Sequence, residues 1–195
     1  MRRQQFSMVL IATVLAAGCT STQLVNTWRD PSFNGPIAFK KTLVVAIHPD
    51  GTLRRDAEDA MVRAIGPDRA VAAYQVMAET DRATASALEA KAKSIGADGY
   101  VTMRIIGTRT ETNWVPPDPG FGPFYDRAMV MSADPAYLQT DHIVNVETRI
   151  YSVAEDKLIW SGTSDTIDLA NVDKAVGQIA NAVRAELQKE KLLAG

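Results

Sequence analysis

Two histidines are the residues of this 195-residue chain whose side chains could most readily support catalysis or metal binding. His48 ends an apolar run and is followed by Asp50, whereas His142 starts another apolar run and is preceded by Asp141. Imidazole and carboxylate groups are ligands for zinc, with zinc–nitrogen bonds of ~2 Å. One hypothesis is therefore a small metal-dependent or hydrolytic enzyme, and it requires a fold that brings the two imidazoles within about 10 Å of each other. The alternative is that both are hydrogen-bonded surface residues at strand ends.

No motif of a familiar catalytic class accompanies these histidines. The chain has no G-x-S-x-G, no H-E-x-x-H and no glycine-rich phosphate loop. Ser161-Gly162 lacks the strand-to-helix context of a nucleophile elbow. Arg54-Arg55 begins a predicted helix beside several acidic residues, which is typical of a solvated helix face. We therefore expect no catalytic residues, no cofactor and no bound metal.

Composition and charge exclude several classes of protein. Hydrophobic residues make up 46% of the chain and charged residues 23%, which is ordinary for a globular domain. The formal charge of −2 lacks the basic excess that nucleic-acid binding needs, so we expect no nucleic-acid partner. A single cysteine excludes an internal disulfide and any multi-cysteine metal site. The length suits one domain.

The first nineteen residues have the pattern of a secretory signal. A basic start at residues 1–3 precedes an apolar run at residues 8–17, and small residues follow up to Cys19. The apolar run is too short to cross a membrane, which needs about 20 apolar residues. The only cysteine stands where such a signal ends.

The segment Leu15-Ala16-Ala17-Gly18-Cys19 resembles the lipobox of bacterial lipoproteins. The resemblance implies that residues 1–18 are removed and that Cys19 is acylated on its thiol and on its new amino group. Two or three acyl chains give stable anchoring, whereas one chain binds weakly. Because Thr20 is not an aspartate, similarity to known sorting signals implies the outer membrane. We expect a lipid-anchored chain that faces the periplasm.

Hydrophobic periodicity in the remaining chain predicts an α/β fold. We expect a single mixed β-sheet of about five strands, flanked by helices in a two- or three-layer sandwich, with the order β-α-β-α-β-β-β-α. Residues 19–37 form the lipidated start and a polar tether, and residues 38–195 form the periplasmic α/β domain. The predicted strands are 42–47, 70–78, 100–112, 143–153 and 157–166, and the predicted helices are 53–65, 82–95 and 172–187.

A loop rich in proline, glycine and aromatic residues interrupts this pattern at residues 114–137. A loop this long within one domain is unusual and is often functional. Its aromatic side chains are candidate partner contacts, because exposed aromatics supply apolar area to an interface. The alternatives are that they fold back onto the sheet or that the loop is disordered. The candidates are Trp114, Phe121, Phe124 and Tyr125.

A set of short motifs also resembles one family. These motifs occur in the order Trp28–Pro31, Lys40–Val45, Ala57–Ala60, Ile95–Gly99, Arg149–Tyr151 and Leu158–Gly162. Together they resemble uncharacterised bacterial envelope lipoproteins of unknown function. The layout is distantly similar to the periplasmic domains of curli-secretion channel lipoproteins and penicillin-binding-protein activator lipoproteins. The channel proteins also carry long amphipathic hairpins, which we do not find in this sequence.

These observations predict a membrane-anchored, non-catalytic binding or assembly module of the cell envelope. Its expected partners are a lipid bilayer, through acylated Cys19, and an envelope protein. The alternative is the metal-dependent or hydrolytic periplasmic enzyme built on His48 and His142.

Overall fold

The computed structural model describes residues 22–82, 84–116, 136–167 and 171–193, which form one mixed sheet with helices packed against it. The strands are β1 (Thr22–Arg29), β2 (Thr42–Ile47), β3 (Ala70–Ala72), β4 (Gly99–Val115), β5 (Tyr137–Ser152) and β6 (Lys157–Ile167). The helices are α1 (Gly51–Ile65), α2 (Ala73–Val76), the 3-10 helix η1 (Glu79–Arg82), α3 (Ala85–Ser94) and α4 (Val172–Lys189). The strand order is β1-β6-β5-β4-β2-β3. The predicted single mixed sheet flanked by helices is therefore confirmed.

Strand β2 shows why an unbroken apolar run predicts a strand that is covered on both faces. It pairs in parallel with β3 and with β4. Leu43 and Val45 pack against α2 and α3, whereas Val44 and Ala46 pack against α1 on the opposite face. Alternate side chains of a strand point to opposite faces, so all four bury apolar area.

Helix α4 covers the largest part of the core. Its apolar stripe packs onto β4, β5 and β6, around the fully buried Trp160. The Trp160 ring lies over Gly162, where a Cβ atom would come within 2.4 Å of it, so only glycine fits. The stripe consists of Ala175, Val176, Ile179, Val183 and Leu187.

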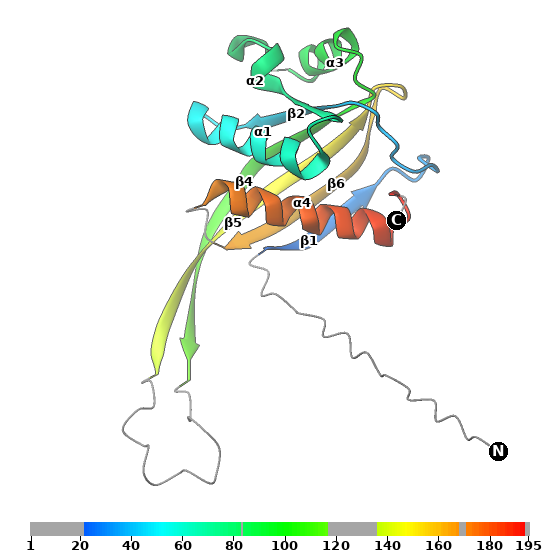
Figure 1. Ribbon diagram of the computed structural model, residues 1–195. Coiled ribbons are helices and arrows are strands. Elements are labelled where there is room, and N and C mark those ends of the chain that lie inside the picture. The colour runs from blue at the N-terminus through cyan, green and yellow to red at the C-terminus, as the bar shows by residue number, and fades with distance from the viewer. Residues whose placement is uncertain (1–21, 83, 117–135, 168–170, 194–195) are drawn as a thin grey trace, which may run out of the picture.

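The number of layers differs along the sheet. Helices α1 and α4 lie side by side over one face, while α2 and α3 cover the opposite face only near β2 (Figure 1). The molecule is therefore a three-layer sandwich at β2 and a two-layer sandwich towards β1. None of the helices within the described ranges combines the length and apolar character needed to cross a membrane.

The prediction of an irregular tether at residues 19–37 is wrong for the eight residues of β1. This strand pairs antiparallel with β6, from Thr22 opposite Thr166 to Arg29 opposite Trp160, and makes the sheet six-stranded. A register shift between Leu24 and Asn26 interrupts the alternation of side chains. An edge strand with one open face and an irregular register shows little hydrophobic periodicity, which explains the error.

Two boundaries before β4 also differ from the prediction. The predicted strand at residues 70–78 stops at Ala72 and continues as helix α2. The predicted helix at residues 82–95 begins only at Ala85, because the Thr84 hydroxyl accepts the Ala87 N–H as its N-cap. Its predicted end is confirmed, since Gly96 has a φ of 68°, which favours glycine.

Strands β4 and β5 are longer than predicted and form a two-stranded arm that projects from the sheet (Figure 1). They pair from Gly99 opposite Ser152 as far as Val115 opposite Tyr137. The predicted loop at residues 114–137 is therefore too wide at both ends, because its first and last residues belong to these strands. We define the arm as residues 108–115 and 137–142.

Candidate functional site

The end of the arm exposes three large apolar side chains. Trp114 and Leu138 lie opposite each other in the pairing of β4 with β5, and their exposed fractions are 63% and 68%. Tyr137, opposite Val115, is also exposed. Sequence analysis selected Trp114 but missed Tyr137 and Leu138, because it placed the start of β5 too late in the chain. Because adjacent residues of a strand point to opposite faces, Trp114 and Leu138 share one face of the arm and Tyr137 lies on the other. The exposed apolar pair on a projecting element is suited to contact a partner.

The other candidates from the sequence lie outside the described residues. They are the predicted lipidation site Cys19 and the loop aromatics Phe121, Phe124 and Tyr125. Trp114 is therefore the candidate contact residue that the structure places.

Ion pairs between neighbouring strands hold the base of the arm on the open face of the sheet. Arg104 on β4 donates to Glu147 on β5 at 2.6 Å, and Arg149 donates to the same carboxylate at 2.9 Å. Burial acts to raise the pKa of Glu147, but hydrogen bonds from the two arginines lower it overall. Glu147 thus remains charged and links the two strands where the arm leaves the body.

A second group of polar contacts ties the arm to β6. Arg109, at the start of the arm, donates to Asp165 of β6 at 2.5 Å, across the intervening β5. Asn145 of β5 donates to the other oxygen of the same carboxylate at 2.5 Å. The hydrogen bond from Arg109 is the main cause of the lowered pKa of Asp165. The arm is therefore fixed at its base by charged groups from three strands.

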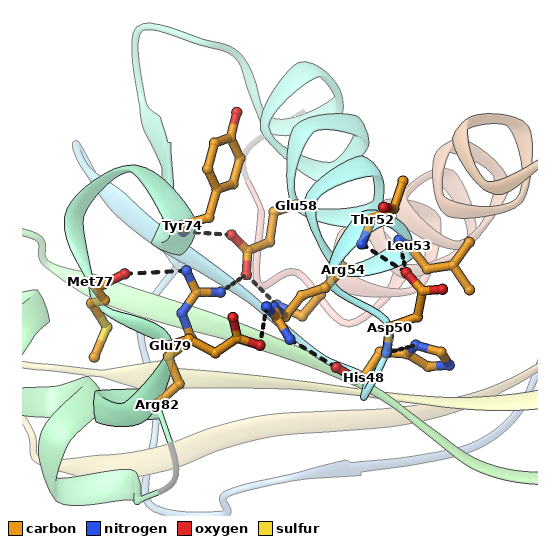
Figure 2. A network of polar contacts seen from close by, with 11 residues as sticks. His48, Asp50, Thr52, Leu53, Arg54, Glu58, Tyr74, Met77, Glu79 and Arg82 are labelled. Carbon is orange, nitrogen blue, oxygen red and sulfur yellow. Dashed lines mark hydrogen bonds and ion pairs between the residues drawn. The ribbon is translucent and has the colours of Figure 1, made fainter.

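A buried carboxylate joins α1 to the segments around it at the other side of the sheet (Figure 2). Glu58 is fully buried, and it accepts hydrogen bonds from the backbone N–H groups of Ala46 and Tyr74. Arg82 pairs with it at 3.0 Å. Burial raises the pKa of Glu58, against the effect of these donors. These contacts join Glu58 to other segments of the fold, which indicates a structural role.

Arg54 lies next to this carboxylate and also makes structural contacts. Its guanidinium donates to the His48 carbonyl at 3.0 Å and to the exposed Glu79 at 2.6 Å (Figure 2). The expectation that Arg54 belongs to a solvated helix face is wrong, because its side chain is buried. It connects the end of β2 to η1.

The structure does not bring His48 and His142 together. The residue before His48, Ile47, pairs with Arg104, whereas His142 pairs with Thr110 further out along β4. At about 3.3 Å per residue, this places the two histidines roughly 15–20 Å apart along the strands. Within the described ranges, no group of three or more His, Cys, Asp or Glu side chains could hold a metal ion.

Each histidine has a local hydrogen-bonding role instead. The His48 Nδ1 accepts the backbone N–H of Asp50 at 3.1 Å, and Asp50 in turn caps the start of α1. His142 lies 3.3 Å from the Thr110 hydroxyl, across the arm. These geometries match the interpretation of both histidines as hydrogen-bonded surface residues.

Comparison with known proteins gives only distant similarities. The chain matches no family model and no curated protein. Among solved structures, a variant PelC dodecamer from Paraburkholderia phytofirmans has a TM-score of 0.44 and 14% identity, over 83% of this chain and 95% of that one. A second PelC dodecamer from the same organism has a TM-score of 0.43 and 16% identity, over 83% of this chain and 94% of that one. Lipoprotein GNA1162 from Neisseria meningitidis has a TM-score of 0.40 and 13% identity, over 76% of this chain and 98% of that one. These values are too low to carry an argument about function.

Proposed function

We propose that this chain is a lipid-anchored, non-catalytic module of the bacterial outer membrane, and that it binds an envelope protein through the end of its arm. The observation that carries the proposal is the exposed apolar pair of Trp114 and Leu138 on one face of a projecting hairpin. Aromatic and large aliphatic residues that are exposed in the free protein are the groups that stabilise an interface when they become buried.

The structure of the arm supports this function. Cross-strand pairs continue to the last residues of β4 and β5, so the backbone is already ordered. Binding through an ordered element costs less conformational entropy than binding through a segment that must first fold. The charged groups at its base hold the arm in a fixed direction relative to the sheet.

The anchor is supported by the sequence. Cys19 follows a short apolar signal at the position that is acylated in bacterial lipoproteins, and the described fold begins at Thr22. The anchor therefore precedes β1 by only a few residues. The acyl chains would keep the sheet close to the bilayer, with the arm directed at a neighbouring envelope protein.

Site-specific photocrosslinking in intact cells tests the partner contact. A benzophenone amino acid is introduced in place of Trp114 or Leu138 in the full chain, and at Lys189 as a matched control. Lys189 is exposed on α4, away from the arm. We expect a protein adduct of one defined mass from the two arm positions and none from Lys189.

Two outcomes contradict the proposal. Adducts from Lys189 but not from the arm would show that the interface lies elsewhere on the chain. An absence of adducts from every position would show that no protein partner is bound at these positions. Palmitate labelling of the wild type and of Cys19→Ala tests the anchor separately. We expect label in the wild type only; label in neither, or in both, would reject acylation at Cys19.

A further inference from the structure

A cavity of about 290 Å³ lies between α1, α4 and the sheet, remote from the arm. Ligand sites in proteins occupy roughly 300–1,000 Å³, so this cavity lies just below that range. Apolar cavities of only ~150 Å³ already take up benzene. The lining is mainly apolar and includes Met61, Val101, Ile150, Val183 and Leu187. Its size and lining suit an apolar chain rather than a polar metabolite.

One polar atom inside the cavity is without a partner. The Thr148 side chain lines the cavity and is only 2% exposed, and its hydroxyl has no hydrogen-bond partner among the residues that the structure describes. A buried hydroxyl without a partner loses the hydrogen bonds that it made to water. An apolar chain inside the cavity would leave this hydroxyl as it is, so Thr148 does not select the ligand.

Two arginines stand at the opening of the same cavity. Arg69 and Arg184 both line it and both are exposed to solvent. The Arg69 guanidinium donates to the Ile65 carbonyl at 3.0 Å, and that of Arg184 donates to the adjacent Ala64 carbonyl. The two positive charges therefore meet at the C-terminal end of α1.

Among the residues that the structure describes, neither arginine has a carboxylate partner, because every ion pair there involves other cations. A guanidinium has five N–H donors, so each of these two retains donors beyond its contact with α1. Paired guanidinium groups with free donors are suited to bind a carboxylate or a phosphate.

We propose that this cavity binds a single-chain anionic amphiphile. The acyl chain occupies the space between α1 and α4, and the anionic head group is held by Arg69 and Arg184 at the opening. The inference is independent of the proposed function, because the cavity and the arm share no residue. It assigns this face of the body to an acyl-chain ligand with a carboxylate or phosphate head group.

Photolabelling of the full chain in phospholipid nanodiscs tests the proposal. The probe is a dodecanoate that carries a diazirine near the end of its chain, and labelled residues are mapped by mass spectrometry. We expect adducts on cavity residues of α1 and α4, such as Met61 and Val183. Mapping the position separates occupancy of the cavity from partition of the probe into the bilayer.

The double variant Arg69→Gln/Arg184→Gln tests the role of the head group. We expect labelling of the cavity to fall by about tenfold or more, since charge-assisted hydrogen bonds are lost. Arg55→Gln is the matched control, because Arg55 is an exposed arginine at the other end of α1 and should leave labelling unchanged. Both substitutions remove surface charges, and circular dichroism verifies that the variants are folded.

Competition with unlabelled compounds distinguishes the sources of the ligand. We expect dodecanoate or dodecyl phosphate to compete and dodecanol not to compete; the more effective anion identifies a fatty acid or a phosphate-bearing lipid. Equal competition by dodecanol would reject anion recognition. Labelling confined to residues outside the cavity, or unchanged labelling in the double arginine variant, would overturn the proposal.

Discussion

Strands β4 and β5 pass through two very different environments along their length. Within the body of the molecule, their side chains Val101, Met103, Val146 and Ile150 are buried under α1 and α4. Beyond the body, the same two strands continue as the arm, where most side chains are exposed. The backbone pairing is continuous, so the secondary structure alone does not distinguish the two regions.

The comparison shows which interactions stabilise each region. The body is stabilised by burial of apolar area and by buried polar contacts such as those of Glu58. The arm has no core, and a two-stranded hairpin on its own is only marginally stable in water. Substitutions in the body should therefore change the free energy of unfolding, whereas substitutions at the end of the arm should change only what the chain binds.

The largest effect is expected for Glu58→Ala in the body. The substitution leaves the Ala46 and Tyr74 N–H groups and the Arg82 guanidinium without their acceptor. Removing one partner of a buried ion pair costs about 3–5 kcal/mol. We expect a loss of this size in the free energy of unfolding, measured by urea denaturation with circular dichroism.

Glu79→Ala is the control for this prediction. Glu79 pairs with the buried Arg54 but is itself exposed, and Arg54 keeps its hydrogen bond to the His48 carbonyl when Glu79 is removed. The loss of stability should therefore be smaller than for Glu58→Ala. If the two variants lost the same stability, the structural role that we assign to Glu58 would be wrong.

A smaller effect that depends on pH is expected at Asp30, just after β1. Hydrogen bonds from Lys157 and Ser32 lower the pKa of Asp30 from 3.8 to about 2. A carboxylate with a lowered pKa in the folded state stabilises the fold above its ordinary pKa, and the contribution is lost as pH falls towards 2. The unfolding midpoint of Asp30→Asn should therefore lie below that of the wild type at pH 5, and the gap should narrow by pH 2.

Urea denaturation at the two pH values measures this gap. Asp68→Asn, at an exposed carboxylate in the turn before β3, is the control for a general change of charge. A gap that stays constant with pH would show that the pair of Asp30 with Lys157 does not hold the end of β1 to the sheet.

Sequence patterns predicted the elements whose apolar residues follow a regular pattern. Helix α4 buries one apolar stripe, and β2 is an unbroken apolar run that is buried on both faces. The predicted bounds of both elements agree with the structure to within a few residues. Strand β1 escaped detection because it lies at an edge and has a register shift. Local periodicity carries no information about a strand that is stabilised mainly by its backbone pairing with β6.

The arm could have been found from the sequence, but the buried carboxylate could not. Threonines alternate at positions 108, 110 and 112 and lead to Trp114, which is typical of a strand exposed on both faces. The partner strand 137–142, on the other side of the proline-rich segment, begins with Tyr137 and Leu138 and continues with polar residues. Glu58, in contrast, occupies an ordinary helical position among other acidic residues. Its burial depends on where α2 and η1 come to lie, which is a property of the tertiary structure.

The smallest effect on stability is expected at the end of the arm, and it provides the sharpest test of the comparison. The double variant Trp114→Ser/Leu138→Ser removes two exposed side chains, so the free energy of unfolding should change by no more than about 0.5 kcal/mol per site. Val146→Ser, in the buried part of β5, is the matched control, and it should cost more than about 2 kcal/mol because it leaves a cavity and buries a hydroxyl. Thermal unfolding measures both. A double variant as unstable as Val146→Ser would mean that the end of the arm packs against another part of the chain, and those side chains would then not be free to bind an envelope protein.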